Sequence, residues 1–149
     1  RMSRGLGDVY KRQGKSVIII QFLKGKNENE LAFLNRLEPE IKIFRFAKSD
    51  ESFEELSEQE QQEEAMNLRN GFNYGKKVVT TAACDMLILD EVLGVIDEKV
   101  VAPQEMQELF ENKPDDMTLI CTGRVLEDSI RPYADEIYNI APEKIRIDE

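Results

Sequence analysis

Three short runs of apolar, largely β-branched residues constrain the fold of this chain most, and each ends abruptly in polar residues. The runs are Ser16–Leu23 (SVIIIQFL), Met86–Leu89 (MLIL) and Met117–Cys121 (MTLIC). Such runs are typical of strands that are buried on both faces of a sheet. A fourth segment, Ile41–Phe46 (IKIFRF), alternates between apolar and polar residues as a strand does, with Ile41 and Ile43 on one side and Arg45 as a candidate for the same side.

Helical patterns separate these strands. We expect helices over 29–37, along the apolar stripe of Ala65, Leu68, Phe72, Val79 and Ala82, over 105–110 and around 126–131, with a last strand around 137–140. Strands separated by helices predict right-handed βαβ units and a mostly parallel sheet. A chain of 149 residues fits one domain. We therefore predict a single α/β domain over residues 14–149.

Composition excludes several classes of protein. The chain has 20 basic and 30 acidic residues, and its basic residues do not cluster, which argues against nucleic-acid binding. No apolar run approaches the roughly 18 residues of a membrane span. Cys84 and Cys121 lie in apolar surroundings and indicate reduced core cysteines, so we expect a cytoplasmic protein. The absence of histidine removes the commonest metal ligand and the usual general base.

Residues 1–13 (RMSRGLGDVYKRQ) are basic and show no hydrophobic periodicity. They resemble translated adapter remnants at the ends of environmental reading frames, and we expect a non-native leader here, with a natural basic arm as the alternative. They also lack the apolar stretch of a secretory signal.

The stretch Asp50–Glu64 contains eight acidic residues and no basic one. Its acids show no ligand-like spacing, so we interpret it as the solvated start of a helix. Ser57 and Glu60 have the spacing of a capping box. Gly71 and Gly75 fall within the same helix, and each is expected to weaken it by roughly 1 kcal/mol relative to alanine.

The polar residues at the strand ends are the candidate functional residues, because ligands of open parallel sheets bind beyond the carboxyl ends of the strands. They are Gln21 with Lys24-Gly25, Asp90-Glu91, and Thr122-Gly123-Arg124. Four apolar residues followed by Asp-Glu form a Walker B pattern, in which carboxylates hold Mg²⁺ against phosphates. Two alternatives stay open: Asp90 as a helix N-cap, and Arg124 as a neutraliser of surface acids rather than a phosphate ligand.

A Walker A loop is not found. Gly14-Lys15-Ser16 supplies the end of G-x-x-x-x-G-K-[ST], but Val9 stands where the first glycine is required. A phosphate loop also opens a helix, whereas this segment leads straight into a strand.

Taken in order, these motifs resemble the ATP:corrinoid adenosyltransferase family. The resemblance rests on 14–17 (GKSV), 21–25 (QFLKG), 37–39 (LEP), 44–46 (FRF), 85–94 (DMLILDEVLG), 122–124 (TGR) and 134–135 (AD). It implies a P-loop, RecA-like α/β fold and transfer of the 5′-deoxyadenosyl group of ATP to the cobalt(I) of a corrinoid, with release of triphosphate. In the family a first strand, the phosphate loop and a first helix precede the segment matching Gly14–Val17. We therefore expect an N-terminally truncated chain that binds ATP poorly.

The resemblance also implies roles for individual residues. Glu91 would help to hold Mg²⁺ on the phosphates with support from Asp90, and Arg124 would contact phosphate charge. Ligand-contacting residues at the same rim would be Gln21, Lys24, Thr122 and Gly123. The aromatic cover that keeps cobalt four-coordinate would come from Phe53 first and Phe46 second.

Partners implied by the family are a flavin-dependent reductant and a second copy of the chain in a homodimer. Two other functions stay open on the residues alone. One is a different P-loop NTPase, a kinase or hydrolase that uses Asp90 and Glu91 in γ-phosphate chemistry. The other is a non-catalytic acidic interaction domain, whose strand-end residues are caps and surface pairs.

Overall fold

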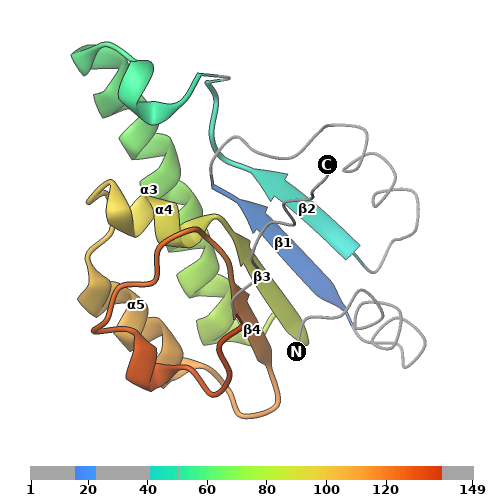
Figure 1. The fold of residues 1–149 in the computed structure, drawn as a ribbon. Coiled ribbons are helices and arrows are strands. Elements are labelled where there is room, and N and C mark those ends of the chain that lie inside the picture. Colours follow the sequence, from blue (N-terminus) through green and yellow to red (C-terminus); the bar gives the residue numbers. More distant parts are fainter. Residues whose placement is uncertain (1–15, 23–40, 50, 139–149) are drawn as a thin grey trace, which may run out of the picture.

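The computed structural model describes residues 16–22, 41–49 and 51–138 (Figure 1). Its elements in chain order are β1 (Val17–Gln21), β2 (Ile41–Arg45), the 3₁₀ turn η1 (Phe53–Glu55), α3 (Glu58–Thr81), β3 (Met86–Asp90), α4 (Val92–Asp97), α5 (Pro103–Asn112), β4 (Thr118–Cys121) and the 3₁₀ turn η2 (Arg131–Tyr133). The expected helix over 29–37 and the expected leader lie outside the described residues.

The four strands form one sheet in the order β2-β1-β3-β4, and every neighbouring pair is parallel. This confirms the predicted α/β class with a parallel sheet. The register places Gln21, at the end of β1, beside Arg45 on one side and beside Asp90 on the other. The carboxyl ends of the three strands therefore lie level at one edge of the sheet.

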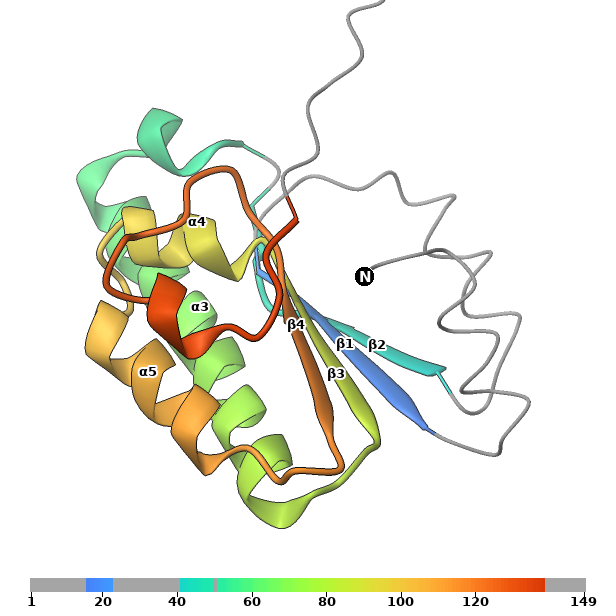
Figure 2. The same cartoon turned by 60° about the horizontal axis from the view of Figure 1, so that its bottom comes forward.

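Helices α3, α4 and α5 all lie on one side of the sheet (Figure 2). Ile18 and Ile20 of β1 and Leu87 and Leu89 of β3 are buried in the core that these helices cover. Because side chains alternate along a strand, Gln21 and Asp90 belong to the opposite side of the sheet. The core thus fixes the direction in which both polar side chains point.

Two glycines bring α3 close to the sheet. A Cβ atom on Gly71 would lie 3.0 Å from the ring of Phe46, and one on Gly75 would lie 3.4 Å from Leu89. The contact at Gly71 is tighter than a Cβ atom normally allows, whereas a Cβ atom at Gly75 would make an ordinary van der Waals contact. The stripe of Leu68, Phe72 and Val79 is buried as predicted. Ala82 is instead an exposed, left-handed C-cap, so its place in the stripe is wrong.

The predicted start of α3 is largely confirmed. The Ser57 hydroxyl accepts a hydrogen bond from the Glu60 N–H (3.2 Å), and the Glu60 carboxylate accepts one from the Ser57 N–H (2.9 Å). The expectation of solvation is wrong for Glu64, which is 7% exposed. Glu64 lies four residues before Leu68 on the buried stripe, so helical periodicity turns it toward the protein interior.

The expected helix around 126–131 is wrong. Residues 126–130 form irregular structure and turns, followed by η2. The Glu127 carboxylate accepts a hydrogen bond from the Ser129 N–H (3.2 Å), which competes with helical pairing. Pro132 lacks the N–H that would bond to the Asp128 carbonyl in a helix. The expected strand around 137–140 is also not formed at residues 137 and 138, which are exposed.

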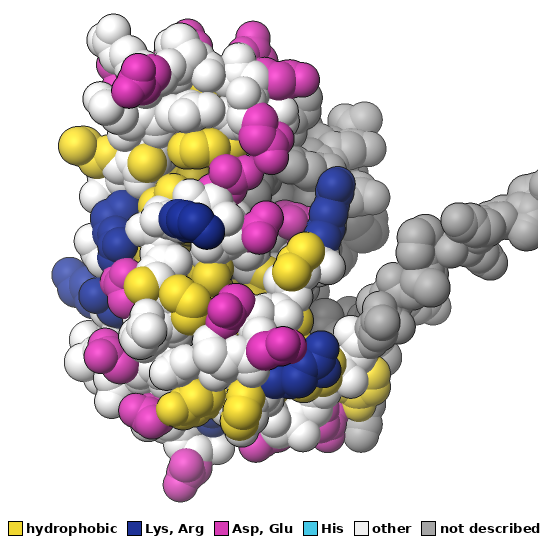
Figure 3. Space-filling model, turned by 60° about the vertical axis from the view of Figure 1, so that its left-hand side comes forward, with side chains coloured by type: hydrophobic (Ala, Val, Ile, Leu, Met, Phe, Trp, Pro, Cys, Tyr) yellow, Lys and Arg dark blue, Asp and Glu magenta, His cyan; other side chains and the backbone are white. Residues whose placement is uncertain are grey.

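The helical side of the molecule carries acidic and basic side chains interspersed with apolar patches (Figure 3). Within the described ranges, none of the helices combines the length and hydrophobicity of a membrane span.

Both cysteines are free thiols, and burial raises the pKa of Cys84 to about 11 and that of Cys121 to about 12. The thiolate is the reactive form, so both thiols stay protonated and unreactive at pH 8. We expect iodoacetamide to modify neither residue in the native protein and both in urea, as measured by mass spectrometry. Modification of Cys84 in the folded protein as fast as that of free cysteine would contradict this expectation.

Candidate functional site

A hydrogen-bonded row of three side chains crosses the carboxyl edge of the sheet. The Gln21 side-chain amide donates to Oδ2 of Asp90 (3.3 Å), and the Thr122 hydroxyl donates to Oδ1 of Asp90 (3.0 Å). Gln21 and Asp90 are both buried. The row joins the ends of β1, β3 and β4, so three of the predicted site residues meet at one place.

Asp90 is not a helix N-cap. It is the last residue of β3, and the N-cap of α4 is Glu91, whose side chain makes no capping hydrogen bond. Each carboxylate oxygen of Asp90 accepts a hydrogen bond from a neutral donor. The structure therefore makes Asp90 the centre of the row and decides against the capping alternative.

Glu91 follows Asp90 in a strained backbone conformation. Its φ is 66° and its ψ is 25°, a left-handed geometry that residues with a side chain rarely adopt. Its backbone N–H donates to the Thr122 hydroxyl oxygen (2.9 Å). Among the described residues, nothing forms a hydrogen bond or ion pair with its carboxylate. Strain of this kind concentrates at functional sites, and here it presents an unengaged carboxylate beside the row.

Gly123 allows the end of β4 to approach α4. A Cβ atom at this position would lie 2.3 Å from Cβ of Leu93 and 3.2 Å from its Cα. The Leu93 N–H also donates to the Thr122 carbonyl (3.2 Å), which fixes the two segments together. Gly123 is thus required by packing at the base of the site.

Replacing Gly123 with alanine is expected to lower the free energy of unfolding by about 2 kcal/mol, since the new methyl group meets backbone as well as side chain. Urea denaturation measures this change. The added change Leu93→Gly removes the Cβ that clashes, so the pair of changes should cost less than the sum of the two single changes. Additive costs would contradict the steric explanation.

Arg124 is exposed and forms no ion pair or hydrogen bond with another described residue. The structure thus gives no support, in the part that it describes, to Arg124 as a neutraliser of surface acids. Its place directly after the row leaves its guanidinium available at the same edge. Lys24 lies outside the described residues.

The two candidate cover residues lie apart from the row, along α3. The Phe46 ring packs on Gly71 and lies 6.0 Å from the ring of Tyr74, measured between centroids. Phe53 is the first residue of η1, and both phenylalanines are half-buried against the core. One backbone contact links this segment to the row, because the Phe46 N–H donates to the Gln21 carbonyl (3.3 Å).

Two polar residues near the site were not identified from the sequence. Arg45 ends β2 in register with Gln21, and its side chain donates to the Ser49 carbonyl (3.4 Å). Glu64 binds the backbone that follows Arg45. The available signals were the alternation of β2, which places Arg45 with Ile41 and Ile43, and the position of Glu64 on an apolar helical stripe.

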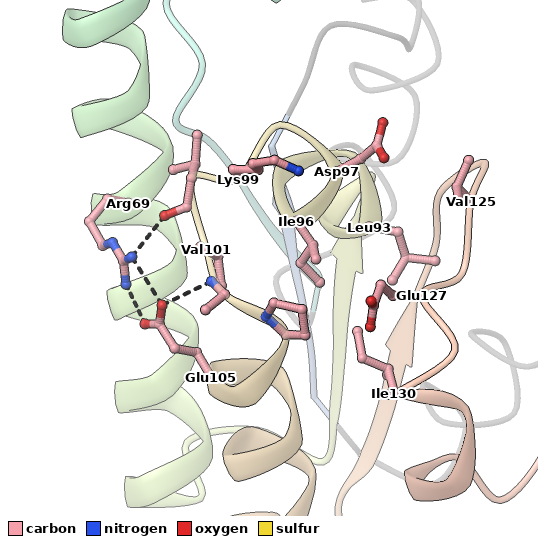
Figure 4. Close-up of a pocket in the computed structure, with 13 residues that line it drawn as sticks. Arg69, Leu93, Ile96, Asp97, Lys99, Val101, Glu105, Val125, Glu127 and Ile130 are labelled. Atoms are coloured by element: carbon pink, nitrogen blue, oxygen red, sulfur yellow. Dashed lines mark hydrogen bonds and ion pairs between the residues drawn. The ribbon is translucent and has the colours of Figure 1, made fainter.

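The structure also contains a pocket of about 590 Å³ between α4, α5 and the segment after β4 (Figure 4). On its wall Arg69 bonds to Glu105 and donates to the Val100 carbonyl (2.8 Å). The hydrogen bond from Arg69 lowers the pKa of Glu105. None of the predicted site residues lines this pocket, and Leu93 is its link to the strand ends. Strand-end chemistry, rather than the pocket, therefore marks the candidate site.

Comparison with known proteins shows the family of the chain. The family model described as "ATP:corrinoid adenosyltransferase BtuR/CobO/CobP" matches residues 4–149. The chain belongs to this family. The predicted family is thus confirmed, and the parallel α/β sheet is consistent with the fold of this family.

Among similar proteins of this family is "Corrinoid adenosyltransferase" of Escherichia coli (strain K12), 25% identical over 135 residues. Another is "Corrinoid adenosyltransferase CobA" of Salmonella typhimurium (strain LT2), 26% identical over 135 residues. In both cases the match covers 91% of this chain and 66% of the relative. The chain therefore spans slightly less than two thirds of the length of these relatives.

Proposed function

We propose that this adenosyltransferase-family chain takes part in transfer of the 5′-deoxyadenosyl group from ATP to the cobalt(I) of a corrinoid, with release of triphosphate. The observation that carries the proposal is the row of Gln21, Asp90 and Thr122 with the unengaged Glu91 beside it. Family membership supplies the chemistry, and this edge supplies the residues that suit a nucleotide phosphate.

Cobalt(I) is itself a strong nucleophile, so the reaction requires no general base from the protein. The absence of histidine is compatible with that requirement. The chain instead has to hold the ribose 5′ carbon in line with the cobalt and stabilise the charge of the leaving triphosphate. Arg124 serves the second task in this proposal, because its exposed guanidinium is suited to bidentate contact with phosphate oxygens.

Magnesium is the metal that the family implies, and the carboxylates present fit it. The described residues contain no cluster of three or more metal-ligating side chains. Mg²⁺ usually binds through one or two carboxylates plus the phosphates of its nucleotide, so a dedicated protein cage is not required. Glu91 would hold the ion, and Asp90 would support it from within the row. The ion would neutralise phosphate charge.

Phe46 and Phe53 provide the aromatic surface in this proposal. Both lie on the segment between β2 and α3, and the Phe46 N–H of this segment donates to the Gln21 carbonyl at the carboxyl edge of the sheet. Covering one face of the corrinoid with apolar rings would exclude water and the lower ligand from cobalt. The remaining partners, a reductant and a second copy of the chain, are expectations from the family alone.

The test uses the chain as given and an extended protein, in which the first strand, phosphate loop and first helix of a relative precede Gly14. With ATP, Mg²⁺ and cob(I)alamin, we expect adenosylcobalamin and triphosphate from the extended protein and much slower turnover from the chain alone. Formation of ADP and phosphate instead would favour the alternative NTPase. Equal rates from the two proteins would contradict the expected need for a phosphate loop.

A further inference from the structure

A buried carboxylate of α3 holds the backbone that follows β2. Glu64 accepts hydrogen bonds from the N–H of Lys48 (3.0 Å) and the N–H of Ser49 (3.2 Å) through Oε2. Its Oε1 accepts from the Lys48 N–H (3.2 Å) and from the side-chain amide of Asn67 (3.2 Å). The Glu64 carboxylate is thus fully used by neutral donors.

This arrangement is costly unless the donors are in place. Burying a polar group costs free energy unless it is hydrogen-bonded, and bonds from backbone N–H groups to a carboxylate are strong ones. The two N–H groups lie beyond the end of β2, where the strand ladder no longer supplies acceptors. Glu64 therefore replaces the sheet as the partner of this backbone.

Two further contacts fix the same segment to the same face of α3. The side-chain amide of Gln61 donates to the Phe53 carbonyl (2.9 Å). At the other end of the segment, the Phe46 ring packs on Gly71. Gln61, Glu64 and Gly71 share one side of the helix, because their spacings of three and seven residues return to it. Glu64 is the central contact, between the two phenylalanines.

We propose that Glu64 is a positioning residue that sets the placement of Phe46 and Phe53, and through them the affinity of the protein for its corrinoid. This inference rests on the proposed function, in which these two rings cover the corrinoid. The hydrogen bonds of Glu64 go to Lys48, Ser49 and Asn67 and, among the described residues, to neither phenylalanine. It acts through the backbone of Lys48 and Ser49, so its loss should affect the corrinoid and leave ATP binding at the row of Gln21, Asp90 and Thr122 unchanged.

The decisive variant is Glu64→Gln, compared with Glu63→Gln. The glutamine retains the shape of the side chain but turns one acceptor oxygen into an NH₂ group that faces N–H donors. Glu63 is exposed on the same helix and loses the same charge, so its change is a matched control. Circular dichroism establishes that both variants are folded before any other measurement.

Two readouts separate positioning from a general structural role. The first is amide hydrogen exchange at Lys48 and Ser49, measured by NMR in the chain as given. The second is the KM for cob(I)alamin and the KM for ATP, measured in the extended protein. In Glu64→Gln we expect exchange to accelerate about tenfold and the corrinoid KM to rise about tenfold, which corresponds to roughly 1.4 kcal/mol. The KM for ATP should stay within about twofold.

Asn67→Ala is a second variant. It keeps the Glu64 carboxylate and removes only the hydrogen bond that the Asn67 side chain donates to it. It should change both readouts in the same direction by a smaller factor.

Unchanged exchange at Lys48 and Ser49 in Glu64→Gln would overturn the anchoring, and so would equal effects in Glu63→Gln. Faster exchange with an unchanged corrinoid KM, or an equal rise in both KM values, would overturn the positioning role. An extended wild-type protein without activity would overturn the proposed function itself.

Discussion

Replacing Glu91 with glycine is expected to stabilise the protein while lowering the rate of adenosylation about a hundredfold in the extended protein. Glycine adopts the left-handed backbone of residue 91 without strain, so the free energy of unfolding should rise by about 1 kcal/mol. The same change removes the carboxylate that we assign to the metal. A loss of about a hundredfold is typical when one preorganised charge-stabilising group is removed. Urea denaturation and initial rates measure the two effects.

Two variants separate these effects. Glu91→Gln keeps the strain and removes only the charge, so it should be as slow as the glycine variant without its gain in stability. Lys99 has a similar left-handed backbone (φ 65°) away from the row. Lys99→Gly should therefore bring the gain in stability alone. A Glu91→Gln protein with the wild-type rate would refute the metal role of Glu91.

Replacing Asp90 with alanine is expected to lower the free energy of unfolding by about 3 kcal/mol, since it leaves the buried Gln21 amide and the Thr122 hydroxyl without their acceptor. The rate of adenosylation in the extended protein should also fall, because the Thr122 hydroxyl that loses its acceptor also holds the backbone N–H of Glu91. In Asp90→Asn, the Gln21 amide can turn to accept from the new NH₂ group. We therefore expect that variant to lose activity while keeping stability within about 1 kcal/mol of wild type.

Asp85 provides the comparison at the other end of β3. Its carboxylate accepts a hydrogen bond from the Ser16 N–H (2.9 Å), far from the strand-end row. Asp85→Ala should cost stability, by about 1 kcal/mol, and leave the rate per folded molecule unchanged. If Asp90→Ala were no less stable than Asp85→Ala, the row would not be a buried network of the kind described.

The strands could be predicted because their signal is local. Val17–Gln21 and Met86–Asp90 are continuous apolar runs up to their last residue, and the sheet buries them between neighbouring strands. The helix expected around Leu126 failed on equally local grounds, because Pro132 and the hydrogen bond between Ser129 and Glu127 outweighed an apolar pattern of only a few residues.

The site was predicted as a set of residues but not as a geometry. Gln21 and Asp90 are far apart in sequence, and their contact depends on the parallel register of β1 and β3. The sequence therefore left two roles open for Asp90, and the structure excludes the N-cap role because Glu91 is the N-cap of α4. Gly123 is similar, since its requirement for glycine comes from Leu93 on another element. Glu64 was expected to be exposed because it belongs to an acidic stretch, although its position four residues before Leu68 places it on the buried stripe of α3.

The two glycines that bring α3 against the sheet have a consequence for the order of folding. Gly71 and Gly75 lower the intrinsic tendency of this segment to form a helix, and their compensation is contact with Phe46, Leu89 and Ile20. That compensation exists only once β1, β2 and β3 are assembled. The middle of α3 should consequently become helical together with the sheet rather than ahead of it, which couples the longest helix of the protein to its non-local contacts.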